Sequence, residues 1–195
     1  MKGEYFCKNL FMLTTSLQKL FNCGSWIHAT EYFQNLINHH GKSYLTLDEE
    51  PIDFTELLKL TSLEFAIDCT SSRSDLHKTW REFSLWCCQP FINYVTVKSC
   101  INAVSVAESF QVDLVTLEEL AVAYQQAFTE RLSSNDTTFG VEYYANILAC
   151  DASNPNIEQS ISSCFNAYAL AMDKLGVPFE KAEQLRKAKF LDLVQ

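Results

Sequence analysis

Cysteine is the residue in this sequence with the most obvious capacity for chemistry, because its thiolate is both a nucleophile and a metal ligand. The chain has 8 cysteines, and two of them, Cys87 and Cys88, are adjacent. A catalytic thiol needs its pKa lowered by a histidine or by the N-terminus of a helix. This pair falls near the expected C-terminal end of a helix, which favours buried structural thiols.

One enzymatic interpretation stays open, namely a cysteine hydrolase whose site is assembled from distant parts of the chain. Its nucleophile would be Cys88 or Cys150, and its base one of the 4 histidines. The sequence has no G-x-S-x-G elbow and no glycine-rich phosphate loop. The leading prediction is therefore a protein that is not an enzyme and has no catalytic residues and no cofactor.

The histidines do not show the spacing of a metal site. His39 and His40 end an expected helix, where a cationic imidazole suits the negative end of the helix dipole. His28 and Glu31 reverse the Glu-x-x-His order of di-iron helices, and the motif has no second copy. None of the cysteines forms a C-x-x-C pair or is paired with a histidine at zinc spacing. We predict no metal site.

The acidic residues are concentrated in one part of the chain. The formal net charge is −9, which disfavours a general nucleic-acid binder. The stretch from Ile101 to Ser160 contains nine acidic residues and one basic residue, Arg131, so its formal net charge is −8. It is either a solvated face or a docking surface for a basic partner. The nine acids are Glu108, Asp113, Glu118, Glu119, Glu130, Asp136, Glu142, Asp151 and Glu158.

A tryptophan adds to the candidate docking surface. Trp86 lies off the apolar stripe that runs from Leu76 to Cys87, so we expect it to face a groove or a partner. Together with acids from the acidic stretch it makes up the predicted partner-binding set. That set is Trp86, Glu118, Glu119, Glu130 and Glu142.

Several features favour a cytoplasmic or nuclear location. The cysteines fall mostly on apolar stripes, which suits a reducing compartment. The apolar segment Phe6–Leu13 is interrupted by Lys8 and Asn9 and does not resemble a signal peptide. No run of 18 apolar residues predicts a membrane span. The sequon at Asn135 is then expected to be unused.

Composition favours a packed helical protein. Hydrophobic residues make up 48% of the chain, while only 5 Gly and 4 Pro are present for tight turns. We predict an all-α fold of about eight or nine short helices in antiparallel hairpins. These would form either an irregular α-solenoid or a compact bundle. The chain is expected to be a single domain, 1–195, with a soft boundary at 42–52.

Apolar side chains recur at helical spacing along most of the chain. Capping boxes are expected at Asp53 with Glu56 and at Thr116 with Glu119, and Asn156 is an expected N-cap. The last helix, rich in both charges, is expected to be solvated. The predicted helices run approximately from Phe6 to Leu20, Trp26 to Ile37, Phe54 to Asp68, Leu76 to Cys87, Leu117 to Leu132, Val141 to Leu148, Ile157 to Leu175 and Phe179 to Leu193.

Residues 91–97 allow two interpretations. They are rich in β-branched and aromatic residues, as in a strand. Tyr94, Val97, Ile101 and Val104 nevertheless keep helical spacing over three turns, so a helix is preferred.

The leading functional hypothesis is a non-enzymatic interaction module or adaptor that holds a partner segment in a helical groove. The acidic stretch favours a partner rich in Lys and Arg, without direct binding of nucleic acid or membrane. Two alternatives stay open. One is an obligate subunit of a larger intracellular complex, and the other is the cysteine hydrolase.

Overall fold

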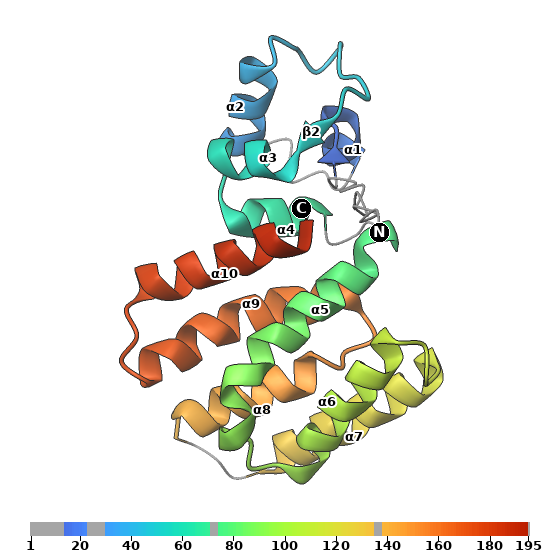
Figure 1. The fold of residues 1–195 in the computed structure, drawn as a ribbon, viewed down its shortest axis with the longest axis vertical. Coiled ribbons are helices and arrows are strands. Elements are labelled where there is room, and N and C mark those ends of the chain that lie inside the picture. Colours follow the sequence, from blue (N-terminus) through green and yellow to red (C-terminus); the bar gives the residue numbers. More distant parts are fainter. Residues whose placement is uncertain (1–13, 23–29, 71–73, 135–137, 195) are drawn as a thin grey trace, which may run out of the picture.

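The computed structural model describes residues 14–22, 30–70, 74–134 and 138–194, and this part of the chain is almost entirely helical (Figure 1). The all-α prediction is confirmed. The described residues form ten α-helices, two 3-10 helices and two strands of two residues. These are β1 (Thr14–Thr15), α1 (Leu17–Asn22), α2 (Glu31–His39), β2 (Ile52–Asp53), α3 (Phe54–Leu60), α4 (Leu63–Thr70), η2 (Ser74–Leu76), α5 (His77–Cys88), η3 (Gln89–Tyr94), α6 (Lys98–Gln111), α7 (Leu117–Ser133), α8 (Val141–Asp151), α9 (Ile157–Lys174) and α10 (Phe179–Val194).

The first predicted helix, from Phe6 to Leu20, is confirmed only from Leu17 onward, because Thr14 and Thr15 form the strand β1 instead. Residues 6–13 lie outside the described residues, and β1 pairs antiparallel with β2. The helix begins only at α1, where the Ser16 hydroxyl accepts a hydrogen bond from the Lys19 amide at 3.2 Å. Two β-branched threonines followed by a capping serine thus set the start of the helix after the apolar stripe has begun.

The helix predicted from Phe54 to Asp68 is divided into α3 and α4. Thr61 has extended backbone, and its hydroxyl donates to the Leu57 carbonyl at 2.7 Å. The Ser62 hydroxyl then accepts from the Phe65 amide at 3.1 Å and caps the second helix. Because hydroxyl side chains compete for backbone groups, the Thr-Ser pair interrupts a stripe that is otherwise continuous.

Residues 91–97 form neither a strand nor a regular α-helix. The 3-10 helix η3 ends at Tyr94, and three residues follow before α6 begins at Lys98. The Asn146 side chain holds this link, because its oxygen accepts from the Thr96 and Val97 amides at 3.0 and 3.1 Å. Its amide group donates to the Thr96 hydroxyl at 2.8 Å. A side chain distant in sequence therefore decides the local conformation.

This link also rotates the buried face of α6 away from the predicted one. On the predicted stripe, Tyr94 and Ile101 are exposed, whereas Val104 is buried as predicted. The helix starts after the link, so its register is set by residues 98 onward and smaller side chains face the core. The buried positions of α6 are Ser99, Cys100, Ala103, Val104 and Ala107.

Helix α9 lies at the centre of the packing. It contacts α8, α5, α10 and α4, and Figure 1 shows it between α10 and the α5–α8 layer. Helices α6 and α7 form a hairpin at one end of the molecule, and α1 to α3 lie at the other (Figure 1). The central position of α9 explains why it is buried on most of its circumference. Its buried residues are Ile157, Ser160, Ile161, Cys164, Phe165, Ala167, Tyr168, Ala169 and Ala171.

The last helix is less solvated than predicted. Within α10, Arg186 is buried, lies 3.8 Å from the centroid of the Phe165 ring and donates to the Phe165 carbonyl at 2.7 Å. Phe190 is buried as well and stacks on Trp80, with 5.4 Å between the ring centroids. The sequence did not indicate this buried face, because one of its residues, Arg186, is charged. The Phe165 ring and the Phe165 carbonyl stabilise that charge.

The predicted N-caps are present. Thr116 and Glu119 form the full capping box of α7, each side chain accepting from the other residue's amide. Asn156 accepts from the Gln159 amide at 3.1 Å, and Asp53 caps α3. These positions are local in sequence, which is why composition and spacing predicted them.

The segment 42–52, expected as a soft boundary, is attached to α1. The Gln18 amide donates to the Asp48 carbonyl at 3.3 Å, and the Ser16 hydroxyl donates to the Glu49 carboxylate at 3.0 Å. The segment then leads into β2, which pairs with β1. The single-domain organisation of 1–195 stays a prediction.

Candidate functional site

A groove with acidic residues along it runs over the α6–α7 hairpin. Two hollows adjoin at Val122 and Gln126, which line both of them, and we call the surface that the two hollows form along α7 the acidic groove. Its carboxylates are Glu118, Glu119 and Glu130, and α6 contributes Asn102 and Val106. The remaining lining residues are Thr116, Ala123, Gln125 and Thr129.

The helical repeat places acidic and uncharged side chains on one face of α7 in the acidic groove. Residues 119, 122, 126 and 130 recur every three or four positions and so lie on one face of α7. Val122 is 68% exposed at the middle of this face. No Lys or Arg is among the described residues that line the groove. The groove therefore combines an apolar anchor point with uncompensated negative charge.

Local hydrogen bonds favour the ionised form of Glu119 and Glu130. The Thr116 backbone amide donates to the Glu119 carboxylate at 2.7 Å and lowers the pKa of that carboxyl. Gln126 donates to the Glu130 carboxylate at 3.0 Å, which lowers the Glu130 pKa in the same way. Both groups are on the surface, where their charge is available to a binding partner.

Three of the five predicted partner-binding residues meet in the acidic groove, and two do not. Glu142 is exposed in the first turn of α8, outside the groove lining. Trp86 is half-buried and stacks on Tyr168, with 5.1 Å between ring centroids, while Phe83 lies at 5.8 Å. Trp86 thus belongs to an internal aromatic cluster at the edge of the core.

The uncharged members of the groove were not predicted from the sequence. Val122 and Gln126 could have been found from their three- and four-residue spacing between Glu119 and Glu130. Asn102 and Val106 could not, because they join the groove only through the pairing of α6 with α7.

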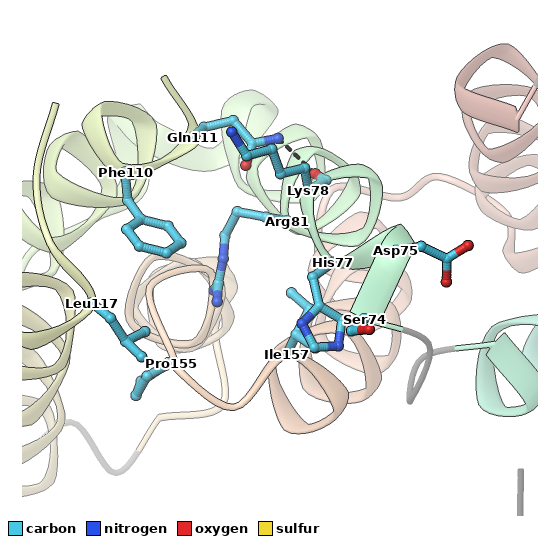
Figure 2. Close-up of a pocket in the computed structure, with 10 residues that line it drawn as sticks. All are labelled: Ser74, Asp75, His77, Lys78, Arg81, Phe110, Gln111, Leu117, Pro155 and Ile157. Atoms are coloured by element: carbon cyan, nitrogen blue, oxygen red, sulfur yellow. Dashed lines mark hydrogen bonds between the residues drawn. The ribbon is translucent and has the colours of Figure 1, made fainter. Parts of the chain in front are cut away.

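A second hollow lies where the start of α5, the end of α6 and the start of α7 meet the beginning of α9 (Figure 2). Its volume is about 640 Å³, and we call it the Arg81 pocket. Phe110, Leu117, Pro155 and Ile157 provide apolar walls. Figure 2 shows the Arg81 side chain extending into the hollow between the walls.

Arg81 is only 3% exposed, yet it has no acidic partner among the described residues. Its Nη1 donates to the Ala152 carbonyl at 2.7 Å and to the Ser160 hydroxyl at 3.3 Å, both uncharged acceptors. Its Nε has no hydrogen-bond partner. Burial lowers the pKa of Arg81 to about 10, a direction that reflects the cost of the charged form.

The free thiols that the structure describes are all buried. Cys87, Cys88 and Cys150 are all fully buried, and burial raises the pKa of Cys88 to about 12. The Cys150 pKa is raised by its interaction with Cys100 and by burial. Neither Cys88 nor Cys150 has a histidine among the groups that shift its pKa.

The paired histidines at the end of α2 face a carboxylate. His39 and His40 place their Nε2 atoms 3.6 and 3.5 Å from the Glu56 carboxylate. No group of three metal-ligating side chains occurs in the described ranges. His28, which forms the reversed di-iron pattern with Glu31 in the sequence, lies outside the described residues.

Comparisons of the chain with protein-family models, with curated proteins and with solved structures give no match. Among the helices that the structure describes, none combines the length and the apolar character needed to cross a bilayer. The site geometry is therefore the basis for inference about function.

Proposed function

We propose that this protein is a non-enzymatic interaction module that binds a basic, amphipathic segment of another protein along the acidic groove. The observation that carries the proposal is that Glu118, Glu119 and Glu130 line one groove together with the exposed Val122. An apolar anchor supplies affinity in such a groove, while charge sets orientation and the rate of association.

The dimensions of the groove define the partner. Glu119 and Glu130 are eleven residues apart on one helix, which corresponds to about 16 Å along its axis. A partner helix of about three turns spans this distance, with Lys or Arg near both ends and an apolar residue between them. The position of Val122 between the acids supports this order of charges and anchor.

The buried, unpaired thiols support a reducing location for this function, in the cytoplasm or the nucleus. Cys87, Cys88, Cys100, Cys150 and Cys164 are free and buried. Disulfides are the rule for cysteine-rich proteins in oxidising compartments, so unpaired cysteines favour a reducing one.

A peptide selection tests the proposal even though the natural partner is unidentified. Random peptides of about 16 residues, displayed on phage, are selected on the full-length protein. We expect enrichment of peptides that carry Lys or Arg on both sides of an apolar residue. These peptides should fail to bind the variant Glu118→Lys/Glu130→Lys. Glu119 is left intact because it is part of the capping box.

A matched control separates the groove from net charge. Glu158→Lys/Glu183→Lys changes the total charge equally, and Glu158 occupies the second position of α9 as Glu118 does of α7. Binding should survive in this control. Enrichment of neutral or acidic peptides, or equal binding to both variants, would contradict the proposal.

One observation favours a second function, that of an obligate subunit of a larger complex. Large apolar side chains are exposed around the same hairpin, including Leu114, Leu132 and Phe139, which are 77%, 65% and 65% exposed. A partner that covers them would make a much larger interface than a single peptide. Self-association of the isolated protein, abolished by Leu114→Ser/Leu132→Ser, would favour this alternative, whereas a monodisperse monomer favours the module.

A further inference from the structure

We propose that the Arg81 pocket is a binding site for a small monocarboxylate with an apolar body. The pocket shares no lining residue with the acidic groove, and this inference does not depend on the proposed function. It rests on a buried cation without a counter-charge, directed into a hollow of ligand size.

Arg81 is a buried cation that lacks an acidic partner among the described residues. A guanidinium on a side chain that is only 3% exposed normally has an acidic partner, because an unpaired buried charge is costly. Here the hydrogen bonds go to the Ala152 carbonyl and the Ser160 hydroxyl, and Ser160 in turn donates to Ser84. The carbonyl ends of α8 offset part of the charge through the helix dipole. The Nε–H is still unpaired.

The acids at the pocket and on its rim do not supply the missing charge. Asp75 lines the pocket but points away from Arg81 (Figure 2). The carboxylate of Asp113 is engaged with Lys78 at 2.7 Å, on the exposed rim. An external anion is therefore the group that completes the environment of Arg81.

The chemistry of the pocket selects a carboxylate from among the anions. A carboxylate matches one guanidinium through paired N–H bonds and carries one charge. A phosphate dianion needs further cations, and the nearby Lys78 is already paired with Asp113. Phe110, Leu117 and Ile157 then call for an apolar body next to the carboxylate.

The size of the pocket also limits the ligand. The volume of about 640 Å³ lies in the range of small-molecule sites. An N-acylated apolar amino acid meets these requirements.

The test uses N-acetyl-L-phenylalanine and octanoate as carboxylates, with N-acetyl-L-phenylalaninamide and 1-octanol as their uncharged counterparts. Binding to the full-length protein is measured by calorimetry and by NMR chemical-shift changes. We expect the acids to bind at least about tenfold more tightly than the uncharged compounds, with shifts at Phe110 and Leu117. Failure of both acids to bind, or equal binding of acid and uncharged partner, would overturn the proposal.

A pair of variants tests the location. Leu117→Glu places a carboxylate beside Arg81, whereas Leu117→Gln has nearly the same shape without the charge. Position 117 opens α7, where an acid favours the helix, so both variants should fold. We expect Leu117→Glu to bind the acids at least about tenfold more weakly than Leu117→Gln. Equal affinities would place the ligand elsewhere and refute the site.

Phenyl phosphate completes the experiment as a test of anion class. We expect it to bind more weakly than the carboxylates, because Arg81 is the only buried cation of the pocket and Lys78 is paired with Asp113. Binding that is at least about tenfold tighter than that of N-acetyl-L-phenylalanine would overturn the carboxylate assignment.

Discussion

Two buried arginines in this protein have different environments. Arg186 is bound to the Phe165 carbonyl and stacked on the Phe165 ring, so its charge is compensated by a dipole and a π-face. Arg81 is bound only to uncharged oxygens and faces a hollow. Both guanidinium groups leave their Nε without a hydrogen-bond partner, so what distinguishes them is the ring stacked on Arg186 and the hollow beside Arg81. At this scale the first arginine is structural and the second is the proposed ligand-binding group.

Removal of Arg186 tests its structural role. Arg186→Ala loses a charge-assisted hydrogen bond, the ring contact and packing between α10 and α9. We expect the free energy of unfolding to fall by about 2–4 kcal/mol, measured by urea denaturation. The exposed Lys181 of the same helix is the control, with a change of at most about 0.5 kcal/mol for Lys181→Ala. Equal losses in the two variants would contradict a structural role for Arg186.

The raised thiol pKa values give a second prediction at the residue scale. With the Cys88 pKa at about 12, only about one thiol in ten thousand is ionised at pH 8. Iodoacetamide should therefore leave Cys87, Cys88 and Cys150 unmodified in the folded protein and label them after unfolding, as read by mass spectrometry. Rapid modification of Cys88 or Cys150 in the native state would revive the hydrolase alternative.

The same thiols predict the direction of a pH effect on stability. Their pKa values are raised by burial above that of an unfolded cysteine, which is about 8.5. The stability contributed by the protonated thiols is fully present below that value and is lost as pH rises toward 12. Urea midpoints that are flat up to pH 8 and decline above pH 9 are expected. The decline should be smaller in Cys87→Ala/Cys88→Ala, provided that this variant folds.

At the scale of elements, prediction succeeded where the signal was local. The capping box at Thr116 and the N-caps at Asp53 and Asn156 depend on neighbours within three residues, and the structure contains them, although at Asp53 only the N-cap half of the predicted box is formed. The break at Thr61 also depends on local residues, namely the hydroxyl groups of Thr61 and Ser62. It was not predicted, because the apolar stripe continues across both residues and indicated a single helix. The end of η3 depends on Asn146, about fifty residues away, and nothing in residues 91–97 themselves reveals it.

Asn146 provides the prediction at this scale. Asn146→Ala leaves the Thr96 and Val97 amides without their acceptor, so the free energy of unfolding should fall by about 2–3 kcal/mol. Asn146→Asp keeps the acceptor oxygen and loses only the donation to the Thr96 hydroxyl, so it should recover part of the loss. Asn166→Ala, at an exposed position, is the control. An equal loss for the Ala and Asp variants would show that the acceptor role is unimportant.

At the scale of the whole molecule, the uneven charge becomes a feature of one end of the fold. The hairpin α6–α7, at one end in Figure 1, holds the acidic groove, whereas the two buried arginines, Arg81 and Arg186, lie inside the packing around α9. The acidic stretch and three groove residues could be located from the sequence. The Arg81 pocket could not, because that hollow forms only where α5, α6, α7 and α9 converge.

Salt dependence follows from this distribution. The groove carboxylates are exposed, so their attraction to a basic partner is screened as ionic strength rises. We expect the affinity for a selected basic peptide to fall at least about fivefold between about 0.05 M and about 0.3 M NaCl. Carboxylate binding at the buried Arg81 should change less over the same range, which distinguishes the two sites. Similar salt dependence at both would contradict their assignment.

The central claim is that the acidic groove holds a basic segment, and titration calorimetry of one selected Lys/Arg-rich peptide tests it most directly. The peptide is titrated into the wild type, Glu118→Lys/Glu130→Lys and the control Glu158→Lys/Glu183→Lys at low salt. We predict at least about a tenfold weaker dissociation constant for the groove variant and less than about a twofold change for the control. Equal weakening in the two variants would show that net charge, and not the groove, attracts the peptide, and would contradict the claim.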